Sequence, residues 1–311
     1  MITVPMDVLK EFPVRKSKKQ KQAFRDALQA YANDLGYQVT VEKGTMGSRN
    51  IVIGNPDTAR YLVTAHYDTC ARLPFPNFIT PCNLLLYLLY QLGLLAVIFL
   101  AVFTVSFLVT VLARDTLLAF WAAYGVFFLI YGLMIAGPAN KTNANDNTSG
   151  VVTVLEIAKA LPEEYRGRVC YVLFDLEEAG LLGSSSYRSA HRKQTLNQVV
   201  LNLDCVGDGD EMMLFPTGKL CKDSEMMEQL SKLCATQERK SLKLHKKGFC
   251  VYPSDQASFP YGVGIAAFRR KKGIGLYCSR IHTSKDTVLE IENVHFLRDR
   301  LTEWFSGCAA Q

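Results

Sequence analysis

The segment YLVTAHYD, residues 61–68, begins as a short apolar run and ends in polar side chains. Tyr61–Thr64 has the composition of a buried β-strand, and His66 and Asp68 follow directly. The same order recurs in VCYVLFDLEE, residues 169–178, and in VVLNLD, residues 199–204. The sequence therefore predicts several strands whose carboxyl ends carry histidine or carboxylate side chains.

Segments with helical spacing of apolar residues alternate with these strands. Pro13 marks a break within the first of them. The predicted helices are Val8–Leu35, Gly150–Leu161, Ser224–Thr236 and Ile291–Phe305, and the further strands are Tyr37–Glu42, Asn50–Ile53 and Gly264–Phe268. This alternation indicates an α/β fold with a mostly parallel, mixed central sheet flanked by helices on both faces. Such sheets carry their chemistry beyond the carboxyl ends of the strands.

Residues 83–136 form a distinct apolar segment whose only charges are Arg114 and Asp115. Asn83–Ala113 and Thr116–Ala136 are each long enough to cross a bilayer, which takes about 20 apolar residues. A pair of buried core helices is the alternative, but core helices of soluble proteins rarely lack a polar face. We therefore expect a transmembrane hairpin at 83–136, with spans at about 84–113 and 116–136. It interrupts one discontinuous domain made of residues 1–82 and 137–311.

Charge and cysteine content suggest where the domain lies. Arg60, Arg72 and Lys141 flank the hairpin on the domain side and Arg114 lies at its tip, which favours a cytoplasmic domain. The nine cysteines include no CxxC pair, and residues 1–20 lack the apolar core of a secretory signal, so reduced thiols are expected. The basic clusters at 15–21 and 269–272 favour solvated faces or contact with anionic lipid, and no nucleic-acid partner is predicted.

Five short motifs carry the candidate chemistry. They are HYD (66–68), NDNTSG (145–150), DLEEAG (175–180), NLD (202–204) and IHTSKDT (281–287). Each has an ordinary explanation alone: Asp146, for example, could cap the helix that follows it. Together they supply imidazole and carboxylate groups, which are ligands for zinc and for Co²⁺ or Mn²⁺.

The order of these motifs resembles the co-catalytic zinc aminopeptidase family, which includes bacterial leucyl aminopeptidases, some carboxypeptidases and the glutaminyl cyclases. The resemblance covers roughly residues 50–82 and 137–305, with the hairpin as an insertion. It implies two Zn²⁺ ions. One would be bound by His66 and Asp204 and the other by Glu178 and His282, with Asp146 bridging both.

The resemblance also implies roles around the metals. Asp68 would accept a hydrogen bond from the far nitrogen of His66 and fix its tautomer. Glu177 would be the general base, taking a proton from water and passing it to the leaving amine. Three ligand carboxylates and one hydroxide would neutralise two Zn²⁺ ions, which together hold the nucleophile and polarise the carbonyl.

Three departures from the family pattern concern substrate recognition. Gln256 stands where the family often has histidine, and only Cys250 remains of a cysteine pair found in some secreted members. Tyr252 could contact the substrate or its oxyanion, or could simply pack, because its offset from Ser254 does not match well.

The leading functional prediction is a membrane-anchored aminopeptidase that hydrolyses N-terminal peptide bonds. The alternatives are an N-acyl or lipidated amino acid amidohydrolase, a glutaminyl cyclase-like acyltransferase, and an inactive membrane scaffold. Because the hairpin separates His66 from Asp146, the site either opens toward the bilayer or is merely tethered to it. The sequence carries no indication of oligomeric state.

Overall fold

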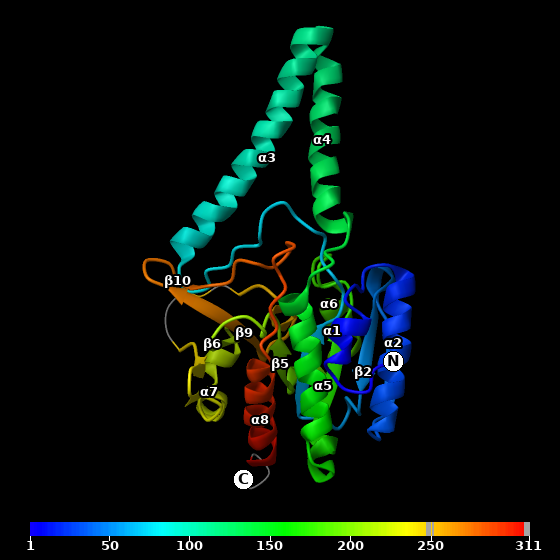
Figure 1. Ribbon diagram of the computed structural model, residues 1–311, viewed down its shortest axis with the longest axis vertical. Helices are drawn as coiled ribbons and strands as arrows, with labels where there is room; N and C mark the ends of the chain where they lie inside the picture. Colours follow the sequence, from blue (N-terminus) through cyan, green and yellow to red (C-terminus); the bar gives the residue numbers. More distant parts are fainter. Residues whose placement is uncertain (247–249, 251, 308–311) are drawn as a thin grey trace.

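The computed structural model describes residues 1–246, 250 and 252–307 (Figure 1). Its helices are α1 (Asp7–Glu11), α2 (Lys18–Asp34), α3 (Leu84–Ala113), α4 (Thr116–Ala136), α5 (Gly150–Ala160), α6 (Leu182–Ala190), α7 (Ser224–Ser231) and α8 (Ile291–Gly307). Its strands are β1 (Val39–Lys43), β2 (Arg49–Ile53), β3 (Tyr61–His66), β4 (Val169–Phe174), β5 (Val199–Leu203), β6 (Glu211–Pro216), β7 (Ala235–Gln237), β8 (Lys240–Leu244), β9 (Gly262–Lys271) and β10 (Gly275–Tyr277).

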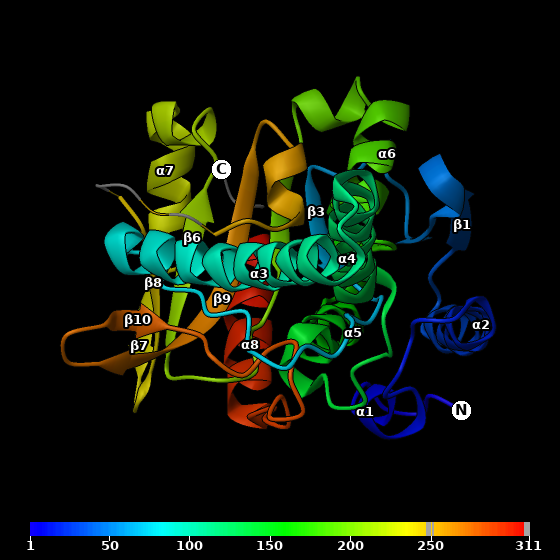
Figure 2. The same cartoon turned by 90° about the horizontal axis from the view of Figure 1, so that it is seen from above.

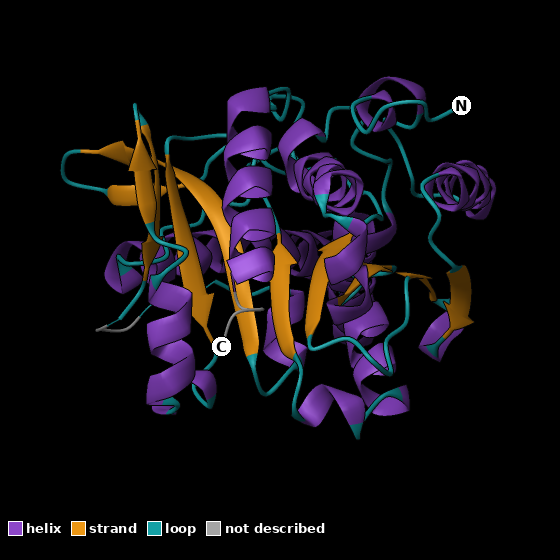
Figure 3. Ribbon diagram, turned by 90° about the horizontal axis from the view of Figure 1, so that it is seen from below, coloured by secondary structure: helices purple, strands orange, loops and turns teal. Residues whose placement is uncertain are grey.

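All these strands join one mixed sheet, in the order β1-β2-β4-β3-β5-β9-β6-β8-β7, with β10 paired to β9 (Figure 3). The central strands β4, β3, β5 and β9 run parallel to one another, whereas β2, β6 and β10 join them antiparallel. The predicted α/β fold with a mixed central sheet is confirmed. Its antiparallel pairs lie toward the margins.

Strand alternation divides the core between the two faces of the sheet. In β3, Tyr61, Val63 and Ala65 point into the larger apolar cluster, and Leu62 points into a smaller cluster on the opposite face. The larger cluster includes side chains of α2, α5 and α8, and the smaller one includes Tyr187 of α6. Figure 2 shows α5 and α8 on one side of the sheet and α6 on the other, while α7 packs with α8 through the same larger cluster. This is why β4 is apolar along its whole length and β3 is apolar except at Thr64 and His66.

The predicted helix Ser224–Thr236 is too long. Helix α7 ends at Ser231, and Ala235–Gln237 instead forms β7, which pairs antiparallel with β8. Apolar side chains at helical spacing continue to Leu233, which buries completely, so spacing alone gave no sign of the strand. Strands β6, β8 and β10 and helix α6 were not predicted either.

Helices α3 and α4 project away from the sheet as a pair (Figure 1). Both are long and apolar enough to cross a membrane, with mean hydropathies of 2.8 and 2.0. No side chain of α3 is buried, and only Ala119 of α4 is, so neither helix is the core helix of a soluble domain. Arg114 takes a left-handed conformation (φ 54°) and Asp115 caps α4 through the backbone N–H groups of Leu117 and Leu118. The helices therefore meet at the charged turn and diverge toward their bases, as both Figures 1 and 2 show.

Candidate metal centre

The predicted ligands come from five separate segments. His66 is the last residue of β3, Asp204 directly follows β5, and Glu178 lies in the turn after β4. Asp146 belongs to the irregular turn Ala144–Ser149 that leads into α5, and His282 lies between β10 and α8. Because β3, β4 and β5 are parallel, their carboxyl ends meet at one edge of the sheet, where the five side chains gather.

Asp146 lies between the two histidines. Its Oδ1 atom is 3.2 Å from Nε2 of His66, and its Oδ2 atom is 3.1 Å from Nε2 of His282. Each carboxylate oxygen thus faces a different imidazole. A carboxylate turned this way can bridge two cations, each of which also binds one histidine.

The remaining acids divide between the two histidines. Oδ1 of Asp204 lies 3.7 Å from Nε2 of His66, and Oε2 of Glu178 lies 3.5 Å from Nε2 of His282. Two groups of candidate ligand atoms share Asp146, and the atoms of each lie within 4.8 Å of one another: His66, Asp146 and Asp204, and Cys70, Asp146, Glu178 and His282. A third such group joins His66 to Glu177 and Glu178.

Buried atoms of this cluster fit a metal. Oδ1 of Asp204 and Oε1 of Glu178 are buried without a hydrogen-bond partner. Buried oxygens are almost always hydrogen-bonded or bound to a cation, so these two match metal ligands. Two imidazoles and three carboxylates also form a donor set that zinc accepts.

The electrostatics of the cluster also favour a bound cation. Burial lowers the pKa of His282, but the negative charges of Glu178 and Asp146 outweigh it and raise that pKa to about 9. Burial raises the pKa of Glu178 to about 7 although His282 opposes it, and burial raises the pKa of Glu177 well above its usual range. Crowded, buried carboxylates favour positive charge at this place, which a divalent cation supplies most effectively.

Side chains on either side of Asp146 hold its turn against β5. The Asn147 side chain donates to the carbonyl of Leu203 (2.9 Å) and accepts from the N–H groups of Gly150 and Cys205. The Asn145 side chain accepts from Gly207 N–H at 2.7 Å. Through these bonds, both asparagines of NDNTSG fix the turn that presents Asp146.

Asp68 contacts the glutamate pair as well as His66. Its carboxylate accepts the backbone N–H groups of Glu177 (3.1 Å) and Glu178 (3.3 Å). Its Oδ1 atom lies 3.5 Å from Nδ1 of His66, longer than an ordinary hydrogen bond. Asp68 therefore fixes the turn that carries Glu177 and Glu178, a role that the motif did not indicate.

A cavity of about 280 Å³ opens beside the cluster. Glu177 lines it, as do Tyr252 and the predicted ligands. The Tyr252 hydroxyl donates to the carbonyl of Asp204 (2.9 Å) and its ring stacks on Phe215, so that in this structure its proton is not aimed at the cavity. Gln256 accepts from Asn202 and donates to the Tyr252 carbonyl, so it supports this loop. A substrate contact by Tyr252 stays a prediction.

Sequence reasoning missed three residues of the centre. Asp286 accepts the backbone N–H groups of Asn145 (2.8 Å) and Asp146 (3.1 Å), and its position in IHTSKDT was the only signal. Cys70 lies beside the ligands.

Arg15, fully buried, donates to the carbonyl of Tyr67 (2.6 Å) and to the Thr148 hydroxyl. The interpretation of residues 15–21 as a solvated face is therefore wrong for Arg15, and also for Lys21, whose ammonium pairs with buried Asp175.

A sequence model of peptidase family M28 matches residues 130–298, more than half of the 311 residues. The chain belongs to peptidase family M28. Membership makes it a zinc-dependent hydrolase of the metallopeptidase class, as the motifs predicted. The matched region contains Asp146, Glu177, Glu178, Asp204 and His282, and it begins after His66. No curated protein sequence matches this M28 peptidase.

Solved structures share its fold. LapA of Legionella pneumophila is 16% identical, with a TM-score of 0.56 over 99% of this chain and 72% of that one. LapB of the same organism is 15% identical, with a TM-score of 0.55 over 96% and 69%. The glutaminyl cyclase of Macrostomum lignano is 12% identical, with a TM-score of 0.56 over 96% and 87%. At these identities the likeness is one of fold alone, and it confirms the α/β fold that the sequence predicted.

Proposed function

We propose that this M28 peptidase is an aminopeptidase that works with two Zn²⁺ ions. His66 and Asp204 would hold one ion, Glu178 and His282 the other, and Asp146 would bind both. The observation that carries the proposal is the orientation of Asp146, whose two oxygens lie 3.2 Å and 3.1 Å from different imidazoles. Co²⁺ or Mn²⁺ would suit the same ligands.

The protein's own groups have distinct parts in this reaction. When bound, the ions supply Lewis-acid polarisation of the scissile carbonyl and activation of the attacking water. Glu177 lines the same cavity, and Asp68 fixes its backbone. Its carboxylate takes the proton of the water and delivers it to the leaving amine, so one residue acts first as base and then as acid.

Replacement of Glu177 by glutamine tests this assignment. We expect turnover of an aminoacyl peptide to fall about 10²–10⁴-fold, the usual contribution of a general base, while the bound metal stays constant. Glu164→Gln, in an exposed glutamate pair, is the matched control and keeps full turnover. Turnover of Glu177→Gln within about twofold of the parent would refute the role. A single zinc at the centre would instead favour a cyclase-like acyltransferase.

The contacts of the segment that leads into α3 favour a membrane-associated substrate, such as an N-acyl or lipidated amino acid. Asn77 and Ile79 line the catalytic cavity. The same segment is attached to α3, because the Tyr90 hydroxyl donates to the carbonyl of Pro76 (2.6 Å) and the Tyr90 ring contacts Phe78. One wall of the cavity is thus continuous with an apolar helix.

Deleting residues 84–135 and joining the ends with a flexible linker separates a substrate role of the hairpin from a tether. We expect the deletion to lower turnover of an acylated substrate in vesicles more than turnover of a soluble peptide. Equal retention of both activities would show that the hairpin only anchors the enzyme.

We further infer that α3 and α4 anchor a cytoplasmic peptidase domain, residues 1–82 and 137–311, in a bilayer. Arg60, Arg72 and Lys141 on the domain side outnumber Arg114 at the tip. A membrane-impermeant maleimide should label exposed Cys221 only after cells are permeabilised, and should label an Arg114→Cys variant at the tip in intact cells. The reverse pattern would place the domain outside.

A further inference from the structure

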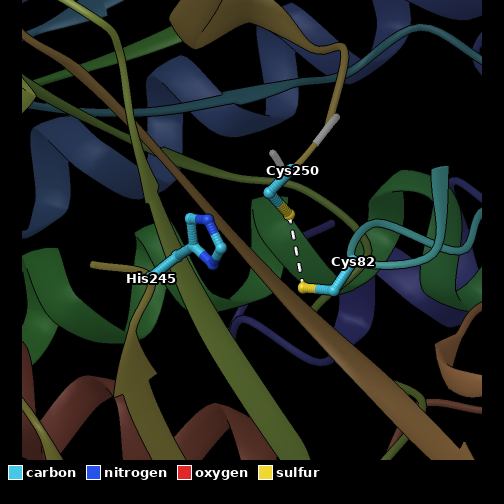
Figure 4. Close-up of side chains that lie close together, drawn as sticks. All are labelled: Cys82, His245 and Cys250. Atoms are coloured by element: carbon cyan, nitrogen blue, oxygen red, sulfur yellow. Dashed lines mark hydrogen bonds between the residues drawn. The ribbon is translucent and has the colours of Figure 1, made fainter. Parts of the chain in front are cut away.

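A second group of metal-type side chains lies away from the catalytic centre. Cys82 comes just before α3, His245 just after β8, and Cys250 just before Tyr252. The two sulfur atoms are 3.4 Å apart although 168 residues separate them in sequence. One imidazole nitrogen and the two sulfurs all lie within 4.8 Å of one another, and Figure 4 shows the three side chains converging.

The chemistry of this group differs from that of the catalytic centre. Thiolate and imidazole are soft ligands that select zinc or similar transition metals. In a tetrahedral zinc site with bonds of about 2.3 Å, two sulfurs lie about 3.8 Å apart. The observed separation of 3.4 Å is close to that value, whereas a disulfide bond is about 2.0 Å long.

We propose that Cys82, His245 and Cys250 form a further metal site that binds Zn²⁺ or a similar soft divalent cation. Cys82 is exposed and the other two are half-buried, so a fourth coordination position faces solvent. The contact with Cys250 lowers the pKa of the Cys82 thiol to about 6, against the opposing effect of burial, and the thiolate is the form that binds metal. The proposal does not depend on the catalytic role of the first centre.

The site would join three parts of the fold. Next to Cys82, the Asn83 side chain caps α3 and donates to the carbonyl of Ile274. The backbone N–H of His245 donates to the carbonyl of Leu214, within β6. Two residues after Cys250, Tyr252 lines the catalytic cavity. A cation held here would clamp the base of α3 to the loop that forms one wall of the active site, and its role is structural.

Cobalt substitution of the full chain in detergent tests the site, because Co²⁺ bound to thiolate absorbs in the near ultraviolet. We expect this absorption in the parent chain and its loss in Cys82→Ser/Cys250→Ser, which should also bind one ion fewer. Cys221→Ser/Cys234→Ser removes one exposed and one half-buried thiol elsewhere and should retain both signals. Cys70→Ala should retain the absorption too, which separates this site from the catalytic centre.

Alkylation of the unmutated protein gives a test that needs no variant to fold. A chelator should increase alkylation of Cys82 and Cys250, measured by mass spectrometry, and leave that of Cys221 unchanged. Three results would each overturn the proposal. They are the absence of thiolate absorption in the cobalt-loaded chain, equal alkylation of Cys82 and Cys250 with and without the chelator, and a Cys82–Cys250 disulfide in protein purified without reductant.

Discussion

Asp286 acts on the metal centre through the backbone. It accepts the N–H groups of Asn145 and Asp146, and it comes from the loop that also carries His282. The two halves of the centre, the turn before α5 and the loop before α8, are therefore joined by one carboxylate. Loss of a group that orients ligands in this way typically lowers metal affinity or activity about 10–100-fold.

Asp286→Asn should weaken zinc binding about 10–100-fold, because the amide puts a donor against a backbone N–H and loosens Asp146. Competition with a chromogenic chelator measures the affinity. Asp34→Asn, at an exposed helix end, is the control and should leave the affinity unchanged. An unaltered affinity in Asp286→Asn would show that Asp146 is positioned by other contacts.

Lys21 and Asp175 form a buried ion pair at the start of the turn that carries Glu177 and Glu178. Lys21→Met leaves the Asp175 carboxylate buried without its cation, and this should lower the free energy of unfolding by about 3–5 kcal/mol. Urea denaturation in detergent measures the change. Lys19→Met removes an exposed charge from the same helix and should stay within about 0.5 kcal/mol of the parent. Equal effects of the two changes would contradict the buried pair.

At the scale of elements, Gly150 lets α5 begin against the end of β5. A Cβ atom there would lie 2.3 Å from the carbonyl oxygen of Leu203 and 2.4 Å from Oδ1 of Asn147. Neither atom can move without breaking the turn that presents Asp146.

Gly150→Ala should therefore destabilise the fold by about 1–3 kcal/mol or more, as overpacking does, and should reduce bound zinc. Thermal unfolding and metal analysis measure both effects. Gly167→Ala is the matched control, since a Cβ atom there meets nothing within 4 Å. A Gly150→Ala protein as stable as its control would mean that this close approach can relax.

The sequence predicted elements best where their burial leaves a local pattern. Strands β3, β4 and β5 are mainly apolar because both of their faces are covered, and α5 and α8 show helical spacing. Helix α6 was missed because its sequence, LGSSSYRSA, is rich in glycine and serine, which are poor helix formers. Strand β7 exists through its pairing with β8, a tertiary contact that the spacing of residues 224–236 does not encode.

The residues of the candidate site also differ in how far the sequence predicted them. His66, Asp146, Glu178, Asp204 and His282 lie in local motifs, so their order along the chain was enough to predict that they meet. Other features depend on segments that are distant in sequence and that only the folded chain brings together. They are the burial of Arg15 and the group formed by Cys82, His245 and Cys250.

At the scale of the whole molecule, α3 and α4 present an apolar surface that no described element covers. Residues such as Leu112, Phe103 and Trp121 are more than 60% exposed. So large an apolar surface is unstable in water and suits a bilayer.

The full chain should therefore remain in the membrane pellet after an alkaline carbonate wash and should dissolve only in detergent. The chain that lacks residues 84–135 is the control and should appear in the supernatant. Recovery of the full chain as a monodisperse soluble protein would contradict the membrane assignment.

The measurement that tests the central claim most directly is zinc-edge anomalous diffraction from crystals of the full chain. Two peaks about 3.5–4 Å apart should flank Asp146, one beside His66 and Asp204 and one beside Glu178 and His282. A single peak at this position, or none, would contradict the two-metal peptidase centre.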